Sequence, residues 1–147
     1  MNPMENLQIK LTHENATVPT RAYGVAAGLD FYALQQVTIA SNKWAEVRTG
    51  IAVALPEGTA GFLYSRSGHG AKSGLSLINS VGVIDGDYRG EILAHIHNEG
   101  RQPYTIRQGE RFCQLIIQKV ETPAIQLVEH LPPTQRGVQG HGSSGRM

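Results

Sequence analysis

The 147-residue chain is long enough to bury one sizeable hydrophobic core and too short for two independent folds, so a single domain is expected. Thirteen Lys and Arg residues and twelve Asp and Glu residues leave a formal net charge of +1, which excludes a protein that coats nucleic acid through clustered positive charge. Cys113 is the only cysteine, which excludes a scaffold held together by intrachain disulfides.

The two ends of the chain have distinct compositions. The first ten residues, MNPMENLQIK, lack the basic start and apolar stretch of a signal peptide, and the sequence has no run of 18 apolar residues. We therefore expect a cytoplasmic protein with no membrane partner. After a β-domain over residues 1–133, the sequence TQRGVQGHGSSGRM holds four glycines and almost no apolar residue. Residues 134–147 are therefore expected to form a flexible C-terminal arm.

Short alternating stretches of apolar and polar residues predict strands along the domain. Gly and Pro interrupt the chain too often for helices of ordinary length, although a short helix is possible near 68–73. Residues 29–49 lack both, but their β-branched side chains favour strands on either side of a turn at 41–43. The run 111–120 is apolar on both faces, which is typical of a strand that is covered on both sides or lies at a subunit contact. Further strands are predicted at 7–11, 37–39, 51–55, 60–65, 75–78 and 92–97, and together they indicate an all-β sandwich or barrel.

Four places in the chain carry polar groups suited to a phosphorylated ligand. In GVIDGDYRG (82–90), Asp85 and Asp87 flank a glycine, which predicts a β-hairpin with acidic groups at its tip. SRSGHGAKSG (65–74) joins a guanidinium, a hydroxyl and exposed backbone N–H groups, and RGVQGHGSSG (136–145) repeats this chemistry in the arm. Asp30 begins an expected strand, where its carboxylate could reach a hydrated Mg²⁺. Taken singly, the three segments are better explained as an ordinary Asx turn, a polar loop and an unstructured terminus, and Asp30 alone is a weak signal.

Taken together and in order, five segments resemble the trimeric dUTPase family over nearly the whole chain: AGLDFYAL (27–34), SRSGHGAKSG (65–74), NSVGVIDGDYRGE (79–91), QGERFCQLI (108–116) and RGVQGHGSSG (136–145). The resemblance implies a jelly-roll-like β-barrel that assembles as a homotrimer with active sites at the subunit junctions. It also implies Mg²⁺-dependent hydrolysis of dUTP to dUMP and pyrophosphate, which limits uracil incorporation into DNA and supplies dUMP for thymidylate synthesis.

The resemblance also implies a role for each matching residue. Asp85 is similar to the base that orients and deprotonates the attacking water, and Asp30 to the carboxylate that holds Mg²⁺ through its water shell. Tyr88 resembles the ring packed against deoxyribose, where an extra 2′-hydroxyl would clash. The uracil-reading positions correspond to Asn79, Gly82, Val83 and Ile84. The phosphate-binding and arm positions correspond to Arg66, Ser67, Gly68, Gln114, Arg136, Gly142, Ser143 and Ser144.

The arm departs from the family pattern at three positions, and one of them, Ser144 in place of a usual Thr, is neutral. His141 stands where the family usually places a Phe that stacks over the uracil, and Gln139 replaces a usual glycine. An imidazole offers less apolar area for stacking than a phenyl ring, so we expect weaker and pH-sensitive closure of the arm. If His141→Phe leaves the KM for dUTP and its pH profile unchanged, this expectation fails.

Three other functions are compatible with parts of the sequence. A dCTP deaminase shares portions of the second and third motifs, but it carries a catalytic Glu where this chain has His95. A nucleotide-binding regulatory protein of the same fold would use the arm to control a protein partner. A β-barrel capsid or decoration protein would explain the composition but not the ordered set of acidic, hydroxyl and guanidinium groups. We therefore predict a dUTP diphosphatase.

Overall fold

A computed structural model describes residues 6–140, 142 and 145, except for the side chains of residues 69–71. The described chain is almost entirely β-structure, with one short helix. Its elements are β1 (Gln8–Leu11), β2 (Leu29–Tyr32), β3 (Val37–Ile39), β4 (Trp44–Arg48), β5 (Ile51–Ala54), β6 (Thr59–Ser65), α1 (Ser67–Ser73), β7 (Leu75–Leu77), β8 (Gly82–Ile84), β9 (Leu93–Asn98), β10 (Tyr104–Ile106) and β11 (Arg111–Lys119). Each strand for which the sequence predicted a range is confirmed to within one residue at each end, namely 7–11, 37–39, 51–55, 60–65, 75–78, 92–97 and 111–120. The short helix expected near 68–73 is confirmed in the same way. β10 was not predicted.

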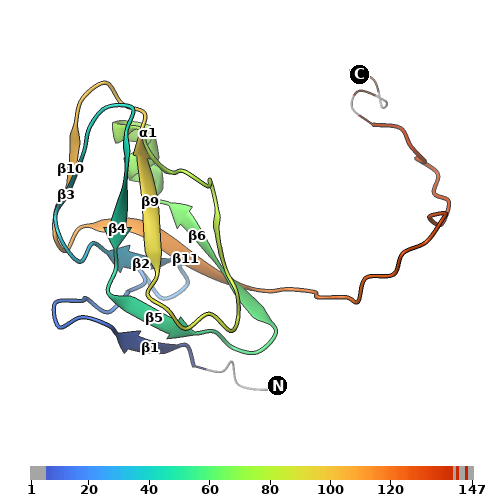
Figure 1. Ribbon diagram of the computed structural model, residues 1–147, viewed down its shortest axis with the longest axis horizontal. Coiled ribbons are helices and arrows are strands. Elements are labelled where there is room, and N and C mark those ends of the chain that lie inside the picture. The colour runs from blue at the N-terminus through green and yellow to red at the C-terminus, as the bar shows by residue number, and fades with distance from the viewer. Residues whose placement is uncertain (1–5, 141, 143–144, 146–147) are drawn as a thin grey trace.

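The strands form four small antiparallel sheets around one core (Figure 1). The largest sheet has the order β2-β11-β6-β8, and a second has the order β4-β9-β7. Two-stranded sheets, β1-β5 and β3-β10, complete the wall. The strand β11 is nine residues long and pairs with β2 along one edge and with β6 along the other. The expected all-β barrel is therefore confirmed, with β11 at the centre of its largest sheet.

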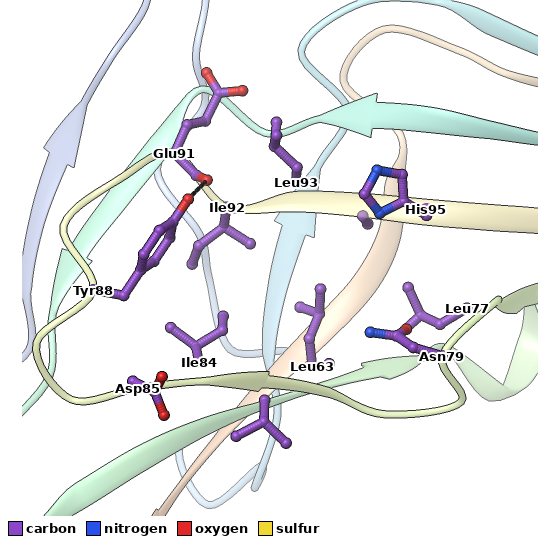
Figure 2. A pocket seen from close by; sticks show the side chains of 13 residues that line it. Leu63, Leu77, Asn79, Ile84, Asp85, Tyr88, Glu91, Ile92, Leu93 and His95 are labelled. Carbon is purple, nitrogen blue, oxygen red and sulfur yellow. Dashed lines mark hydrogen bonds between the residues drawn. The ribbon is translucent and has the colours of Figure 1, made fainter.

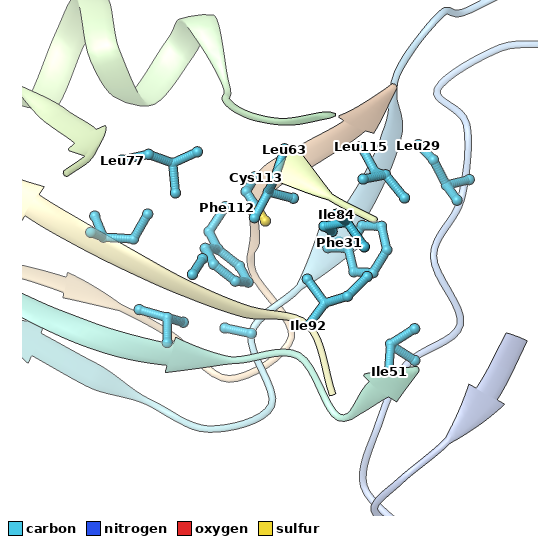
Figure 3. Packing of buried hydrophobic residues seen from close by; sticks show 14 of the residues in the cluster. Leu29, Phe31, Ile51, Leu63, Leu77, Ile84, Ile92, Phe112, Cys113 and Leu115 are labelled. Atoms are coloured by element: carbon cyan, nitrogen blue, oxygen red, sulfur yellow. The ribbon is translucent and has the colours of Figure 1, made fainter. Parts of the chain in front are cut away.

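The core is built from side chains that alternate inward along these strands (Figure 3). Phe31, Ile39, Ile51 and Leu115 are almost inaccessible to solvent. Cys113 is a free, fully buried thiol among these apolar side chains, and burial raises its pKa. Such a thiol packs as a small hydrophobe and does not act as a nucleophile.

The predicted hairpin at residues 82–90 is wrong. β8 pairs with β6, whereas β9 pairs with β4 and β7, so the strands on the two sides of the turn belong to different sheets. The turn itself is present, since the Tyr88 N–H donates to the Asp85 carbonyl at 3.1 Å. Ile84 and Ile92 are both buried in the core. Because both side chains pack into the same interior, β8 and β9 are separated on the two sides of the turn. A pocket opens between them.

Residues 121–140 leave the barrel after β11 and run away from it (Figure 1). All of them are exposed, including the apolar side chains of Ile125, Leu127 and Leu131. The hydrogen bonds found in this segment are local, such as the one from Arg136 Nε to the Gln139 carbonyl at 2.8 Å. In the described part of the chain, no helix is long and apolar enough to cross a bilayer.

Candidate active site

A pocket of about 320 Å³ lies between β8 and β9, with the turn at residues 85–90 closing one end (Figure 2). This volume is at the lower end of the range for small-molecule sites, and a mixed apolar and polar lining is typical of them. Asp85 and Tyr88 lie at one end of the pocket, and Asn79 and His95 lie at the other. The lining residues are Leu63, Leu77, Asn79, Gly82, Val83, Ile84, Asp85, Tyr88, Glu91, Ile92, Leu93, Ala94 and His95.

The backbone beside the pocket offers hydrogen-bonding groups that no strand ladder uses. β8 lies at the edge of its sheet, with β6 as its neighbour, so its other edge is free of ladder bonds within the described structure. An exposed strand edge presents N–H and C=O groups in a fixed alternation, which suits the donor and acceptor pattern of a nucleobase. Ser80 holds the preceding turn with a left-handed φ of 61°, and the Val81 N–H donates to the Asn79 carbonyl at 2.6 Å. The turn thereby places Asn79 beside the edge of β8.

The acidic turn brings a carboxylate and an aromatic ring to the mouth of the pocket. Asp85 is exposed, so its carboxylate can hold a water molecule at the pocket entrance. Tyr88 is 44% exposed, and its hydroxyl donates to the Glu91 carbonyl at 2.8 Å. A Cβ at Gly90 would lie 2.5 Å from the Tyr88 hydroxyl oxygen, so the glycine is required for the ring to fold back in this way.

A second polar cluster lies on the outer face of the β2-β11-β6 sheet. The Asp30 carboxylate is nearly buried and lies beside two guanidinium groups: Arg66 Nε at 3.3 Å and Arg111 Nη1 at 3.6 Å. Gln114 stands opposite Asp30 in the strand register, and its Nε2 donates to the Ser65 carbonyl at 3.2 Å. The cluster has the excess of positive charge and the polar donors that phosphate groups require.

Gly28 of the first motif has a steric role in this cluster. A Cβ at this position would come within 2.2 Å of Gln114 Oε1, so only glycine leaves room for the amide. Ser67 and Gly68 begin α1 next to Arg66, and both are exposed. The structure therefore brings Asp30, Arg66 and Gln114 together and adds Arg111.

The pocket and the polar cluster are far apart within one chain. Ile84 pairs with Gly61 near the start of β6, whereas Arg66 follows the end of that strand. The rise of a strand and the spacing between neighbouring strands place Asp85 roughly 20 Å from both Arg66 and Asp30. Groups that act on one phosphorus atom must lie within hydrogen-bond reach of it, directly or through one water molecule. The pocket groups and the polar cluster of one chain therefore cannot both act on the same phosphorus atom.

Comparisons with known proteins match nearly the whole chain. The profile of the family described as dUTPase matches residues 14–145. The chain belongs to the dUTPase family. It is 42% identical to the deoxyuridine 5'-triphosphate nucleotidohydrolase of Nocardia farcinica, covering 99% of this chain and 88% of that protein.

Two solved structures of other members show the same fold. The Staphylococcus bacteriophage 80alpha dUTPase with dUpNHpp has a TM-score of 0.88 and 32% identity, covering 95% of this chain and 98% of that one. A mutant dUTPase from phage phi11 of S. aureus, solved to show coordination of a structural Mg(II) ion, has a TM-score of 0.82 and 28% identity. The match covers 88% of this chain and 100% of that one.

Three residues of the pocket and the polar cluster were not predicted as site residues from the sequence. Arg111 lies within the fourth motif, so its position there was an available signal. His95 follows the outward alternation of β9 and lines the pocket, where its Nε2 lies 3.1 Å from Glu46 Oε2. Glu91 closes the third motif and is bonded to Arg48, which no local pattern indicates.

The arm residues of the dUTPase pattern are only partly described. Arg136 is exposed and lies in the segment that leaves the barrel, and Gly142 has a left-handed φ of 77°. His141, Ser143 and Ser144 lie outside the described residues. The expected weak closure through His141 therefore stays a prediction.

Proposed function

We propose that this protein is a dUTP diphosphatase that hydrolyses dUTP to dUMP and pyrophosphate. The observation that carries the proposal is the pocket between β8 and β9, which combines an unpaired strand edge, the amide of Asn79, the ring of Tyr88 and the carboxylate of Asp85. Those groups suit a base, a sugar and a water-activating carboxylate in that order. The relatives named for this activity, and the phage enzyme solved with a dUTP analogue, support the same substrate.

We further propose a homotrimer in which each active site combines the pocket of one subunit with the polar cluster of the next. The separation of roughly 20 Å between Asp85 and Arg66 supports this, because a shared site brings together groups that one chain keeps apart. The exposed apolar side chains of Ile125, Leu127 and Leu131 also favour a second copy as their partner. Residues 134–147 then serve as the arm that closes over a site, with Arg136, Gly142, Ser143 and Ser144 near the terminal phosphates.

In the proposed reaction, the base lies along β8 and bonds to the backbone of Gly82, Val83 and Ile84 and to Asn79. Tyr88 packs against the deoxyribose, and the space it leaves excludes a 2′-hydroxyl. The Asp85 carboxylate accepts a proton from the water that attacks the α-phosphorus, and a positioned base of this kind contributes about 10² to 10⁴ in rate. The bond from the α-phosphorus to the bridging oxygen breaks, and pyrophosphate leaves.

The polar cluster holds the phosphate chain. Arg66, Ser67, Gly68 and Gln114 offer a guanidinium, a hydroxyl, a backbone N–H and an amide to the phosphate oxygens. Asp30 is a hard oxygen donor that fits Mg²⁺ held through water, since this ion commonly takes one or two carboxylates and completes its shell with water and phosphates. Among the described residues no three His, Cys, Asp or Glu side chains converge as a metal site. Bound Mg²⁺ would offset charge on the leaving pyrophosphate.

The test is pyrophosphate release from dUTP in the presence of Mg²⁺, alongside dCTP, dTTP and UTP. Asp85→Asn should abolish most of the release, and Asp87→Asn is the matched control because it removes a carboxylate from the same exposed turn. The reaction and the base would both be supported if the wild type strongly prefers dUTP and if only Asp85→Asn loses pyrophosphate release. An equal loss of pyrophosphate release in both variants would show that Asp85 is not the specific base.

The alternatives from the sequence give different outcomes in the same assay. Ammonia release from dCTP would identify a deaminase. The phage 80alpha relative comes from work describing phage dUTPases that control transfer of virulence genes. A folded protein that binds dUTP without releasing pyrophosphate would therefore favour the regulatory alternative.

A further inference from the structure

A partly buried ion pair ties the segment that lines the pocket to the neighbouring strand β4. The Glu91 carboxylate accepts hydrogen bonds from Arg48 Nε at 2.9 Å and Arg48 Nη2 at 2.8 Å, and from the Thr12 hydroxyl at 2.9 Å. We call Thr12, Arg48 and Glu91 the Glu91 clamp. Two-pronged contacts between a guanidinium and a carboxylate fix orientation as well as distance. The side chain of Glu91 is therefore held in one place.

Backbone bonds next to the clamp fix the main chain at the same point. The Ile92 N–H donates to the Ile51 carbonyl at 2.8 Å, and the buried Thr49 hydroxyl donates to the Ile92 carbonyl at 2.7 Å. The Thr12 N–H donates to the Gly50 carbonyl at 2.8 Å. The segment that follows the pocket turn is thus bonded by side chain and backbone to the connection between β4 and β5.

Glu91, whose side chain the clamp fixes, also binds Tyr88 through its backbone carbonyl. The Tyr88 hydroxyl donates to the backbone carbonyl of Glu91 at 2.8 Å, and Gly90 leaves the space for that contact (Figure 2). Within the described part of the chain, the Tyr88 hydroxyl makes no second hydrogen bond. The direction of its ring therefore depends on where the Glu91 carbonyl lies.

We propose that Arg48 and Glu91, with Thr12, are positioning residues that set the orientation of Tyr88 and thereby the selectivity for a 2′-deoxy sugar. This inference rests on the proposed function, because it concerns how that site distinguishes deoxyribose from ribose. Selectivity based on excluding one hydroxyl requires a wall that does not yield. A small displacement of a positioned group is enough to weaken such discrimination.

The charge of the clamp is maintained under ordinary conditions. The hydrogen bonds from Arg48 hold the pKa of the Glu91 carboxyl below its usual range, with a smaller contribution from Thr12. The hydrogen bond to Glu91 in turn raises the pKa of the Arg48 guanidinium. His13 and Glu46 are the other charged groups that act on the pair. The ion pair is therefore complete at neutral pH.

The experiment compares kcat/KM for dUTP and UTP in the full-length protein and in Glu91→Gln, Arg48→Gln and Thr12→Val. Glu99→Gln is the control for removing a glutamate charge outside the clamp and the pocket, and Thr38→Val is the control for removing a threonine hydroxyl that makes a hydrogen bond elsewhere. Thermal unfolding of each variant reports whether it is folded. The relative affinities for dUMP and UMP, from calorimetric titration, give a readout that does not require hydrolysis.

We expect the ratio of kcat/KM for dUTP to that for UTP to fall about tenfold in Glu91→Gln and Arg48→Gln. Thr12→Val should lower it by a smaller factor because two of the three bonds remain. Arg48→Lys should recover part of the ratio, since an ammonium restores the charge but not the two-pronged contact. Both controls should keep the wild-type ratio, and the dUMP to UMP affinity ratio should follow the same order.

A merely structural role predicts a different pattern. If folded clamp variants lose activity on dUTP and UTP by the same factor, or keep the wild-type ratio, the inference is wrong while the proposed function stands. If Glu91→Gln does not fold, Thr12→Val and Arg48→Lys decide the question by the same ratio. If the wild type releases no pyrophosphate from dUTP, the proposed function fails, and an unchanged dUMP to UMP affinity ratio in the variants overturns the inference independently.

Discussion

Mixing two inactive variants should restore activity if the active site is shared between subunits. Asp85→Asn removes the carboxylate at the pocket, and Arg66→Gln removes a guanidinium from the polar cluster. The two positions lie roughly 20 Å apart in one chain, so a shared site takes each from a different subunit. Each variant alone carries one lesion in every site. The loss from the Asp85 change should be about 10² to 10⁴ in rate.

In trimers assembled at random from equal amounts of both variants, each site draws its pocket and its cluster independently. About a quarter of the sites then receive an intact pocket and an intact cluster, because each half is intact in half of the subunits. Pyrophosphate release per subunit should therefore recover to about a quarter of the wild-type rate in the whole mixture, and to about a third in purified mixed trimers, because each of these has one intact site in three. The assay uses co-expressed variants with different affinity tags, and sequential purification isolates trimers that contain both.

Two controls establish what the recovered rate means. Mixing either variant with wild type should give about half of the wild-type rate, which shows that an inactive neighbour does not block an intact site. The two variants mixed after folding, without subunit exchange, should stay inactive. A purified mixed trimer with no activity above the single variants would refute the shared site, because it would show that Asp85 and Arg66 must belong to the same chain.

Three further predictions concern packing and charge. Thr49→Val removes a buried hydroxyl that donates at 2.7 Å and accepts at 3.1 Å, so the free energy of unfolding should fall by about 2 kcal/mol in urea titrations, with an unchanged m value. Gly28→Ala should displace Gln114, against which its Cβ would lie at 2.2 Å, and raise the KM for dUTP roughly tenfold at nearly unchanged thermal stability. An unchanged KM would show that the Gln114 amide does not bind substrate. The lowered pKa of Glu91 predicts that its ion pair stabilises the fold fully at neutral pH and ceases to do so as the pH falls through that pKa. The stability difference between wild type and Glu91→Gln should therefore shrink below about pH 4 in urea titrations, and a constant difference would contradict this.

The strand positions were largely predictable because they depend on local sequence. Alternating apolar residues record which face of a strand is buried, and Gly and Pro mark where a strand must end. β11 was predicted from its apolar residues on both faces, and the turn at 41–43 from its polar residues between β-branched runs. The short strand β10 offers only three residues, YTI, which is too little alternation to stand out.

The pairing of β8 shows the limit of such reasoning. Its sequence and the turn after it have the pattern of a hairpin, and a hairpin would have paired it with β9. The structure instead places it beside β6, because burying Ile84 and Ile92 in one core separates the two strands. The separation creates the pocket. A local sequence pattern cannot predict that β8 pairs with β6, because this pairing depends on how side chains from several strands pack in one core.

The sequence by itself determined that the chain is a small all-β protein with acidic, basic and glycine-rich segments in the order of the dUTPase motifs. Composition, periodicity and motif order are local or linear properties, and they can be read without coordinates. Only the tertiary structure decided that Asp85 lies far from Arg66, and that Arg48 reaches Glu91 across 43 positions of sequence. Contacts of this kind form when the barrel closes, because closure brings together residues whose spacing along the chain carries no signal of their proximity.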